Sequence, residues 1–395
     1  MRKRVALTEE GRLVEVYFDL PGKRVVTGSI YKGRVETVLP GMGAAFVDVG
    51  EGQALFLSQN EISPALQAHR GGRRGGRSPI QKVLRAGDNV IIQVRREAMG
   101  KKNPQGTTKV SLPGRYWVFL PNEDRTAVSR RVGDSKEVRR LRQVANELKG
   151  KGEGLIARTA ARGASREDLE RDFRFLVGTW KGIEQEAETV EGPRLVYEGM
   201  DVVRSLIRDR FTQEVNTVLV DDEREYREIV EFMRYLHLEQ LKEKVSLYKG
   251  PMSLFVRYEV ERQLREALQR KVPLKGGGFL SIDETEALTA IDVNTGSNVR
   301  HRNQEAAIIN TNLEASREIP RLLRLRRISG IIVVDYVDMA SPGNEQKVVD
   351  TLQEELAKDR VPADFIDITQ LGLVEITRRR QGESLAVTMD SMEED

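Results

Sequence analysis

The spacing of apolar residues changes along this sequence, and this change limits the possible folds more than any other feature. Between residues 12 and 57, apolar and polar positions alternate and are interrupted by turn sequences such as Pro-Gly-Met-Gly at 40–43, which is typical of short consecutive strands. Helical spacing follows over 134–149 and 165–190. The chain is therefore expected to begin with β structure and to continue with helices.

A chain of 395 residues is longer than a single hydrophobic core supports, so about two to four domains are expected. Strand-like runs at 90–94 and 110–120 extend the β-rich start. Together with the earlier strands they predict a small five-stranded barrel over roughly 25–110. The glycine tract 276–278 marks a hinge at which a new unit begins.

The last part of the chain alternates apolar runs with helical patterns. This alternation predicts an α/β layer. Pro320 removes a backbone hydrogen bond and is expected to kink the first of its helices. The expected strands are 279–282, 287–293, 331–335 and 365–368, and the expected helices lie near 303–325 and 343–358.

The amino-acid composition limits the location of the protein and the kinds of metal site that it can have. Hydrophobic residues make up 39% of the chain and charged residues 32%, as in a folded, soluble protein. There is no long apolar run and no signal-type start, so a cytoplasmic location and no membrane partner are expected. The chain has no cysteine and 3 histidines, which excludes thiolate metal sites and disfavours a histidine-rich zinc centre. A catalytic metal would have to be held by oxygen ligands.

Basic residues are concentrated in one segment. The net charge of +3 indicates little by itself, but residues 63–85 contain no Asp or Glu, and their arginines and lysines are interleaved with glycines. Such a segment could follow a phosphate backbone. The clusters at 130–131 and 378–380 are either further nucleic-acid contacts or solvated surface.

Two aspartates at the ends of predicted strands give the strongest indication of a catalytic site. Asp292 and Asn294 are two residues apart and point to the same face of a strand, while Asp335 ends an apolar run that is expected to be a neighbouring buried strand. In an open α/β sheet, ligands collect outside the carboxyl ends of the strands. Three oxygen ligands would then converge, which suits a magnesium ion that activates water and neutralises a phosphodiester. The alternative is that both aspartates merely cap turns.

Longer runs around these residues resemble a known family. The run Gly-Phe-Leu-Ser-Ile-Asp-Glu-Thr-Glu-Ala-Leu-Thr-Ala-Ile-Asp at 278–292 resembles the DNase I-like catalytic part of the ribonuclease E and ribonuclease G family. The resemblance covers nearly the whole chain. Further matches to the catalytic part are 310–315, 323–326 and 334–339, and matches to the family's S1 barrel are 30–33, 44–48 and 56–57.

This resemblance implies a multidomain fold that combines α+β and α/β parts. An S1 (OB-type) β-barrel and a 5′-sensor part are inserted into an RNase H-like part, and a DNase I-like α/β catalytic part follows. The implied boundaries are 1–24 and 204–268 for the RNase H-like part, 25–108 for the S1 barrel, 109–203 for the 5′-sensor part and 269–395 for the DNase I-like part.

The resemblance also implies roles for single residues. Asp292 and Asp335 would hold magnesium, and Asn294 would orient one of them or the scissile phosphate. Asp338 is a nearby acidic residue whose role stays open.

On the S1 barrel, Phe46 and Phe56 match the family's base-stacking positions, and Lys101 or Lys102 matches its phosphate-contacting lysine. An aromatic face stacks on any base and contributes about 1–3 kcal/mol per base. A buried core position is the alternative for both rings.

The 5′-sensor part would grip a terminal monophosphate. Arg158 and Thr159 match the family's phosphate-binding motif, and Gly114 and Val118 match its backbone contributors. A guanidinium, a hydroxyl and main-chain N–H groups are the donors that a phosphate dianion needs. The chain departs from the pattern at Pro362, where the family pocket can include an arginine.

The implied activity is that of a magnesium-dependent endoribonuclease. It would hydrolyse internal phosphodiester bonds of single-stranded RNA, leave a 5′-phosphate and a 3′-hydroxyl, and favour 5′-monophosphorylated RNA, in rRNA processing and mRNA decay. Two alternatives stay open. One is a non-catalytic S1-type RNA-binding regulatory protein, and the other is a DNA-cutting nuclease.

The chain looks more like the short ribonuclease G type than the E type, because it has no long Pro- or Arg-rich tail. It ends close to where the family's zinc-binding and dimerisation segments would follow. The family's Cys-Pro-x-Cys motif is replaced by Ser-Leu-Ala-Val-Thr-Met-Asp at 384–390, so no structural zinc is expected. A homodimer or higher homo-oligomer would have to use ordinary protein surfaces.

Overall fold

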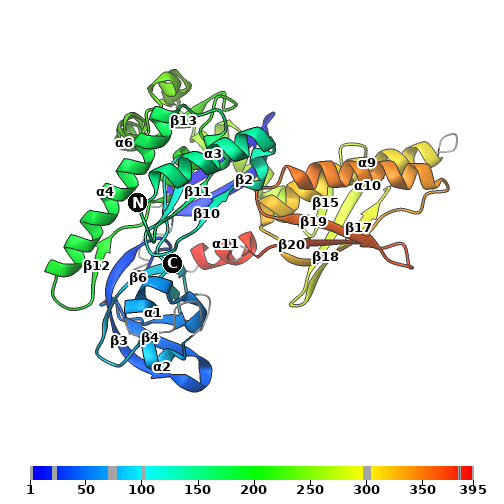
Figure 1. Ribbon diagram of the computed structural model, residues 1–395. Helices are drawn as coiled ribbons and strands as arrows, with labels where there is room; N and C mark the ends of the chain where they lie inside the picture. Colours follow the sequence, from blue (N-terminus) through cyan, green and yellow to red (C-terminus); the bar gives the residue numbers. More distant parts are fainter. Residues whose placement is uncertain are drawn as a thin grey trace. The chain divides into compact units, whose positions relative to one another are not determined.

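The structure is a computed structural model (Figure 1). It describes residues 3–19, 25–69, 78–98, 103–296, 304–380, 382 and 384–393. The chain divides into two compact units: the first contains Asp19–Leu247, and the second is formed by Lys3–Phe18 together with Tyr248–Asp395. Both contain helices and strands, so the protein belongs to the mixed α+β class. Among the helices of the described residues, none is both long and apolar enough to cross a bilayer.

A closed five-stranded barrel forms the start of the first unit. Inward-facing side chains such as Val47, Leu57 and Ile92 are fully buried. A Cβ at Gly33 would lie 2.5 Å from the Val47 side chain, so the strands can approach each other only with glycine there. The predicted barrel over roughly 25–110 is thereby confirmed. Its strands are β3 (Ile30–Leu39), β4 (Ala44–Asp48), β5 (Leu55–Ser58), β7 (Gln105–Thr107) and β6 (Asn89–Arg96), and pairing of β3 with β6 closes it. The short helices η1 (Pro40–Met42), η2 (Gln59–Glu61), α1 (Pro64–His69) and α2 (Ile80–Val83) lie between these strands in the chain.

A four-stranded sheet with two long helices follows. Asp134 and Ser165 cap α3 (Ser135–Leu148) and α4 (Arg166–Thr189), because their side chains accept hydrogen bonds from backbone N–H groups of the first turn. The apolar faces of both helices pack with Trp117 and Phe119 in one core. Both helices agree with the predicted ranges. The sheet order is β10 (Thr126–Val128), β11 (Gly154–Ala157), β9 (Trp117–Leu120) and β8 (Leu112–Pro113), with η3 (Arg130–Val132) and η4 (Thr159–Ala161) in the connections.

The rest of the first unit consists of shorter elements. β12 (Arg194–Tyr197) returns to the barrel and pairs with β3, with Arg194 opposite Lys32. β13 and β14 form a two-stranded parallel sheet. The elements after β12 are α5 (Val202–Arg210), β13 (Val218–Val220), α6 (Glu223–Tyr235), η5 (Glu239–Lys244) and β14 (Val245–Leu247).

A six-stranded sheet forms the centre of the second unit. Helices α9 (Gln304–Arg326) and α10 (Pro342–Ala357) lie side by side over one face (Figure 1), where Ile291, Val334 and Leu322 are buried. The opposite face keeps exposed positions such as Ile331. The strand order is β15 (Lys271–Pro273), β16 (Phe279–Glu284), β17 (Leu288–Asn294), β18 (Gly330–Asp335), β20 (Val374–Arg378) and β19 (Ala363–Ile368), and only β17 and β18 are parallel neighbours.

The first strands of the chain also belong to the second unit. Leu13 and Val16 of β2 lie in the same buried core as Val260 and Leu264 of α8. The elements concerned are β1 (Lys3–Glu9), β2 (Arg12–Asp19), α7 (Leu254–Arg257) and α8 (Val260–Leu268), and α11 (Leu385–Glu393) closes the chain's described part.

The structure confirms the strands and helices predicted between 279 and 368, and it adds β15 and β20. Residues 12–19 and 110–120 contain strands as predicted, but these strands lie outside the barrel. The first segment forms β2, and the second contains β8 and β9 of the four-stranded sheet. The glycine tract 276–278 is not a hinge between units. It lies in the turn between β15 and β16, where the Leu274 N–H donates to the Gly278 carbonyl over 2.8 Å.

Candidate functional site

Two aspartates lie side by side at the ends of parallel strands. Asp292 on β17 is in register with Asp335 on β18, and both are exposed, whereas the alternate residues Ile291 and Val334 are buried under the helices. Adjacent strands lie about 4.8 Å apart, so two side chains in register on one face can bind a common ligand. The structure therefore brings together the two carboxylates that were predicted to converge.

Asn294 joins this pair. It lies on the same face of β17 as Asp292, and its Nδ2–H donates to a carboxylate oxygen of Asp292 over 2.7 Å. This bond orients the carboxylate and leaves the amide oxygen of Asn294 as a further oxygen donor.

The donor atoms of this site are the oxygens of two carboxylates and one amide. Such a set suits Mg²⁺, which takes one or two protein carboxylates and keeps several waters. The part of the chain that the structure describes contains no cluster of three or more Asp, Glu, His or Cys side chains that could hold a metal. The residues present therefore fit a hydrated magnesium ion rather than an ion enclosed by protein ligands. Asp338 is exposed in the loop after β18.

Asn312 on α9 holds the loop that follows Asp335. Its side chain is fully buried, its Nδ2–H donates to the Val337 carbonyl over 2.7 Å, and its Oδ1 accepts from the Val337 N–H over 3.2 Å. Tyr336 shares a hydrogen bond of 2.9 Å with Ser316 of the same helix. Burial raises the pKa of Tyr336, so the phenol stays protonated at neutral pH. Helix α9 thereby positions the backbone directly after Asp335.

A second contact from α9 supports the end of β17. The Glu314 carboxylate accepts hydrogen bonds from the N–H groups of Lys275 and Gly276, the latter over 2.9 Å. A Cβ at Gly278 would lie 2.5 Å from the Asn294 carbonyl oxygen, so this turn approaches the strand only because glycine stands there. Periodicity did not indicate the roles of Asn312 and Glu314, although both lie in a run on which the family resemblance rests.

Phe46 and Phe56 form a pair on the outside of the barrel. They lie opposite each other on β4 and β5, with ring centroids 5.8 Å apart and an interplanar angle of 67°. Both are half-buried, whereas their neighbours Ala45 and Leu57 are fully buried. The structure thus places neither ring in the core. Lys101 and Lys102 lie outside the described residues, as do Arg70, Arg73, Arg74 and Arg77 of the basic segment.

The four residues expected to bind a terminal phosphate lie in or beside the four-stranded sheet. Arg158 contacts Gly114, since its Nη1 donates to the Gly114 carbonyl over 2.6 Å. Thr159 is exposed, and its hydroxyl lies 3.0 Å from that of Ser129. Val118 is on β9, which pairs with the strand that leads to Arg158.

Arg158 has a second partner that the sequence did not reveal. Its Nη2 lies 2.7 Å from Asp209 on α5, and Arg208 binds the same carboxylate at 2.6 Å. Burial alone would raise the pKa of Asp209, but the hydrogen bond from Arg208 and the charge of Arg158 lower it. An anion that binds Arg158 must therefore compete with an ionised carboxylate.

Asp172 on α4 stabilises the backbone next to Gly114. Its carboxylate accepts hydrogen bonds from the N–H groups of Arg115, Tyr116 and Trp117 over 3.0, 2.8 and 2.9 Å. A Cβ at Gly114 would lie 2.6 Å from the Asp172 oxygens, so only glycine allows this approach. Asp172 could not be identified from the sequence, because it acts on a segment more than fifty residues earlier in the chain.

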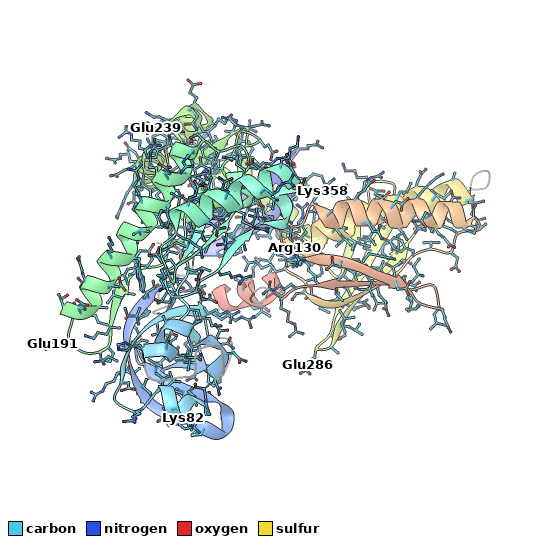
Figure 2. All side chains as sticks on the ribbon, in the orientation of Figure 1. Lys82, Arg130, Glu191, Glu239, Glu286 and Lys358 are labelled. Atoms are coloured by element: carbon cyan, nitrogen blue, oxygen red, sulfur yellow. The ribbon has the colours of Figure 1, made fainter. Side chains whose placement is uncertain are left out.

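One basic cluster is partly structural. Arg378 is buried, and it donates to the Asp359 carboxylate and the Ile328 carbonyl, each over 2.8 Å, so it cannot contact a nucleic acid. Pro362 lies just before β19, and its carbonyl accepts from the Arg379 N–H over 2.9 Å. Arg130 of the other cluster is exposed (Figure 2).

Comparisons with known proteins point to one family. A family profile described as the Ribonuclease E/G family matches residues 111–381. The chain is 37% identical to Ribonuclease G of Salmonella typhimurium (strain SL1344) over 97% of its own length and 78% of that protein. It is 36% identical to Ribonuclease G of Escherichia coli (strain K12) over the same shares. It is also 37% identical to Ribonuclease E of that strain, over 97% of this chain and 36% of the relative.

Proposed function

This chain belongs to the ribonuclease E/G family, and from that membership we propose that it hydrolyses internal phosphodiester bonds of single-stranded RNA in RNA processing. The observation that carries the proposal is the in-register pair of Asp292 and Asp335, with Asn294 bound to the first carboxylate. Like charges in register on neighbouring strands repel each other. A protein that only bound RNA through its barrel would have no need for this arrangement, whereas a metal-dependent nuclease requires it.

Asp292 and Asp335 are the residues that would hold Mg²⁺. When bound, such an ion supplies Lewis acidity: it neutralises charge on a phosphodiester and lowers the pKa of a water molecule. Asn294 keeps the Asp292 carboxylate in one orientation through its 2.7 Å hydrogen bond. The contacts of Asn312 and Glu314 hold the backbone at the ends of both strands. Since the chain has no cysteine, we propose that it carries no structural zinc.

The barrel would bind the RNA strand through its outer surface. Phe46 and Phe56 are half-buried, adjacent and outside the core, which is the exposure that base stacking needs. Lys101 or Lys102 would contact a phosphate. Because stacking tolerates any base, this surface favours single strands without selecting a sequence.

The four-stranded sheet would sense the 5′ end. The exposed Thr159 hydroxyl and the Arg158 guanidinium would bind a terminal monophosphate, supported by the backbone at Gly114 and Val118. Because Arg158 already binds the Gly114 carbonyl and Asp209, the phosphate would replace part of these contacts. Only a dianion that accepts hydrogen bonds from several donors can compensate for the lost contacts of Arg158. A 5′-hydroxyl offers no such charge.

We propose that the chain has the domain arrangement of the family. The shared core of β2 and α8 supports a link between the start of the chain and the region before the six-stranded sheet. We assign 25–108 to the S1 barrel, 109–203 to the 5′-sensor part, 1–24 and 204–268 to an RNase H-like part, and 269–395 to a DNase I-like part.

Incubation of the pure protein with labelled single-stranded RNA and DNA, with and without magnesium, tests the proposal. Internal cuts in RNA that require magnesium are expected. RNA binding without any cut would support the regulatory alternative, and equal cutting of DNA would support the DNase alternative.

A further inference from the structure

A cavity of ≈ 570 Å³ lies in the first unit, lined by residues of the barrel, the four-stranded sheet, and α5 with the segment before it. Its volume is within the range of small-molecule sites, which is about 300–1,000 Å³. None of the residues assigned above to cleavage, base stacking or 5′ sensing lines it. The cavity therefore needs an explanation of its own.

Two cationic side chains in its wall have no charged partner among the described residues. Lys109, between β7 and β8, and Arg125, before β10, line the cavity, and neither makes an ion pair or a side-chain hydrogen bond within the described part of the chain. The other two cations of the wall have carboxylate partners, because Arg95 pairs with Glu61 and Arg208 shares Asp209 with Arg158. Glu123 adds one carboxylate, which leaves an excess of positive charge. Such a wall favours an anion.

The remaining wall offers two further kinds of surface. The lining residues include Tyr197 and Met200, whose side chains have an aromatic ring and a thioether, and Thr27 and Ser205, whose side chains have hydroxyl groups. Aromatic rings stack on nucleobases, and hydroxyl groups can bind a ribose. Cations, a ring and hydroxyls together match the three parts of a ribonucleotide.

Gln93 is a buried residue of the cavity lining. Its Nε2–H donates to the carbonyls of Gly28 and Ser111 over 3.1 and 3.0 Å, and its Oε1 accepts from the Ser111 N–H over 2.9 Å. These bonds tie the barrel to the segment that enters the four-stranded sheet. A bound ligand would consequently contact both parts.

We propose that this cavity binds a ribonucleotide, with its phosphate at Lys109 and Arg125 and its base against Tyr197. The nucleotide is either a free ribonucleoside monophosphate or one unit of an RNA strand. The proposal goes beyond RNA cleavage and does not depend on it, because the cavity shares no residue with the carboxylate site.

Calorimetric titration of the intact chain with adenosine 5′-monophosphate, without magnesium, is the first test. The double variant Lys109→Ala/Arg125→Ala is expected to bind at least about tenfold more weakly than the wild type, since it loses two charge-assisted contacts. Lys181→Ala, which removes an exposed lysine of α4 that does not line the cavity, should bind like the wild type. Thermal melts of all variants check that folding is retained.

Two further measurements locate the ligand. The methyl resonance of Met200, assigned with Met200→Leu, should shift on titration in the wild type and in Lys181→Ala but not in the double variant. Thr159→Val separates this cavity from the 5′ sensor. If Thr159→Val abolishes binding and the double variant does not, the ligand occupies the sensor and the proposal is wrong.

A 5′-hydroxyl RNA oligonucleotide distinguishes the two sources of the nucleotide. If the ligand is part of an RNA strand, the double variant should lose at least about tenfold in affinity for this oligonucleotide even where the free monophosphate does not bind. Unchanged affinity of the double variant for both probes would overturn the proposal.

Discussion

At the scale of single residues, exposure separates the groups that can touch a ligand from those that hold the fold. Phe46 and Phe56 are half-buried on the outside of the barrel, while Phe119 is fully buried in the core of the four-stranded sheet. A ring of the first kind contributes to binding, because it is covered only when a base arrives. A buried ring such as Phe119 stabilises the fold whether or not RNA is bound.

Phe46→Ala and Phe56→Ala are each expected to weaken RNA binding by about five- to a hundredfold, which corresponds to about 1–3 kcal/mol per stacked base. Their melting temperatures should stay close to that of the wild type. Phe119→Ala provides the contrast, since loss of a buried ring costs about 3–5 kcal/mol. Fluorescence anisotropy and thermal melts measure both quantities. Large losses of stability in the first two variants would show that these rings belong to the core.

The site residues that could be identified from the sequence are those whose position along a strand determines on which face of the sheet the side chain lies. Asp292 and Asp335 end apolar runs, and the parallel pairing of these runs was sufficient to bring them together. Asn312, Glu314 and Asp209 could not be identified in this way. Each acts on a segment that is distant in sequence, and side-chain periodicity contains no information about such contacts.

At the scale of elements, Glu137 shows how one side chain holds a helix to a neighbouring loop. On α3 it accepts two hydrogen bonds from Arg140, over 2.8 and 2.7 Å, and one over 2.9 Å from the Gly163 N–H in the loop before α4. The Arg140 hydrogen bond, with a smaller contribution from Gly163, lowers the pKa of Glu137 to about 2. The ionised carboxylate therefore connects α3 to the loop that precedes α4.

Glu137→Gln should lower the free energy of unfolding by about 1 kcal/mol near neutral pH, the size usual for such hydrogen bonds and ion pairs. Because the folded pKa of about 2 lies below the reference value of 4.5, the stabilisation is complete above pH 4.5 and is lost as the pH falls towards 2. Urea unfolding of both proteins across this range should show their difference shrinking. A difference that stays constant down to pH 2 would mean that ionisation of Glu137 is irrelevant.

Helix α9 has the corresponding role at the carboxylate site. Asn312→Ala would leave the Val337 N–H and carbonyl without their partner, at a cost of about 1–3 kcal/mol, and would loosen the backbone after Asp335. Cleavage should fall by about tenfold or more at limiting magnesium and recover in part as magnesium is raised. Asn310→Ala, at an exposed position of the same helix, is the control. If magnesium does not restore any activity, Asn312 acts on stability alone.

The elements that the sequence did not predict are short or depend on distant partners. β15 has three residues, which is too few for a clear alternation, and β20 is a short strand of five. β12 joins the barrel through β3, and β2 joins the second unit through α8. Local patterns specify that a segment is a strand. The element with which this strand pairs or packs depends on the burial of side chains elsewhere in the chain.

At the scale of the whole molecule, the proposed sensor and the carboxylate pair belong to different units. Arg158 and Thr159 lie in the first unit, and Asp292 and Asp335 lie in the second. The five-stranded barrel and the mixture of helices and strands could be predicted from the sequence, because changes in periodicity mark changes in the kind of element. The assignment of Lys3–Phe18 to the second unit was not, since it rests on packing between the two ends of the chain.

A 5′-monophosphorylated RNA should be cut faster than the same RNA with a 5′-hydroxyl or 5′-triphosphate. A hydroxyl lacks the charge-assisted hydrogen bonds, and a triphosphate fits a monophosphate pocket poorly. Thr159→Val should remove the preference without slowing cleavage of the 5′-hydroxyl RNA. Time courses on the three substrates decide this, and equal rates for all three in the wild type would contradict the sensor assignment.

Single-turnover cleavage by Asp292→Asn and Asp335→Asn tests most directly whether Asp292 and Asp335 form the catalytic centre. Each variant keeps the size of the side chain but loses the charge that would hold magnesium. Cleavage is expected to fall by about a thousandfold or more, because each 1.4 kcal/mol of lost transition-state stabilisation is about tenfold in rate. RNA affinity and melting temperature should stay near those of the wild type. Cleavage at the wild-type rate by both variants would contradict this assignment.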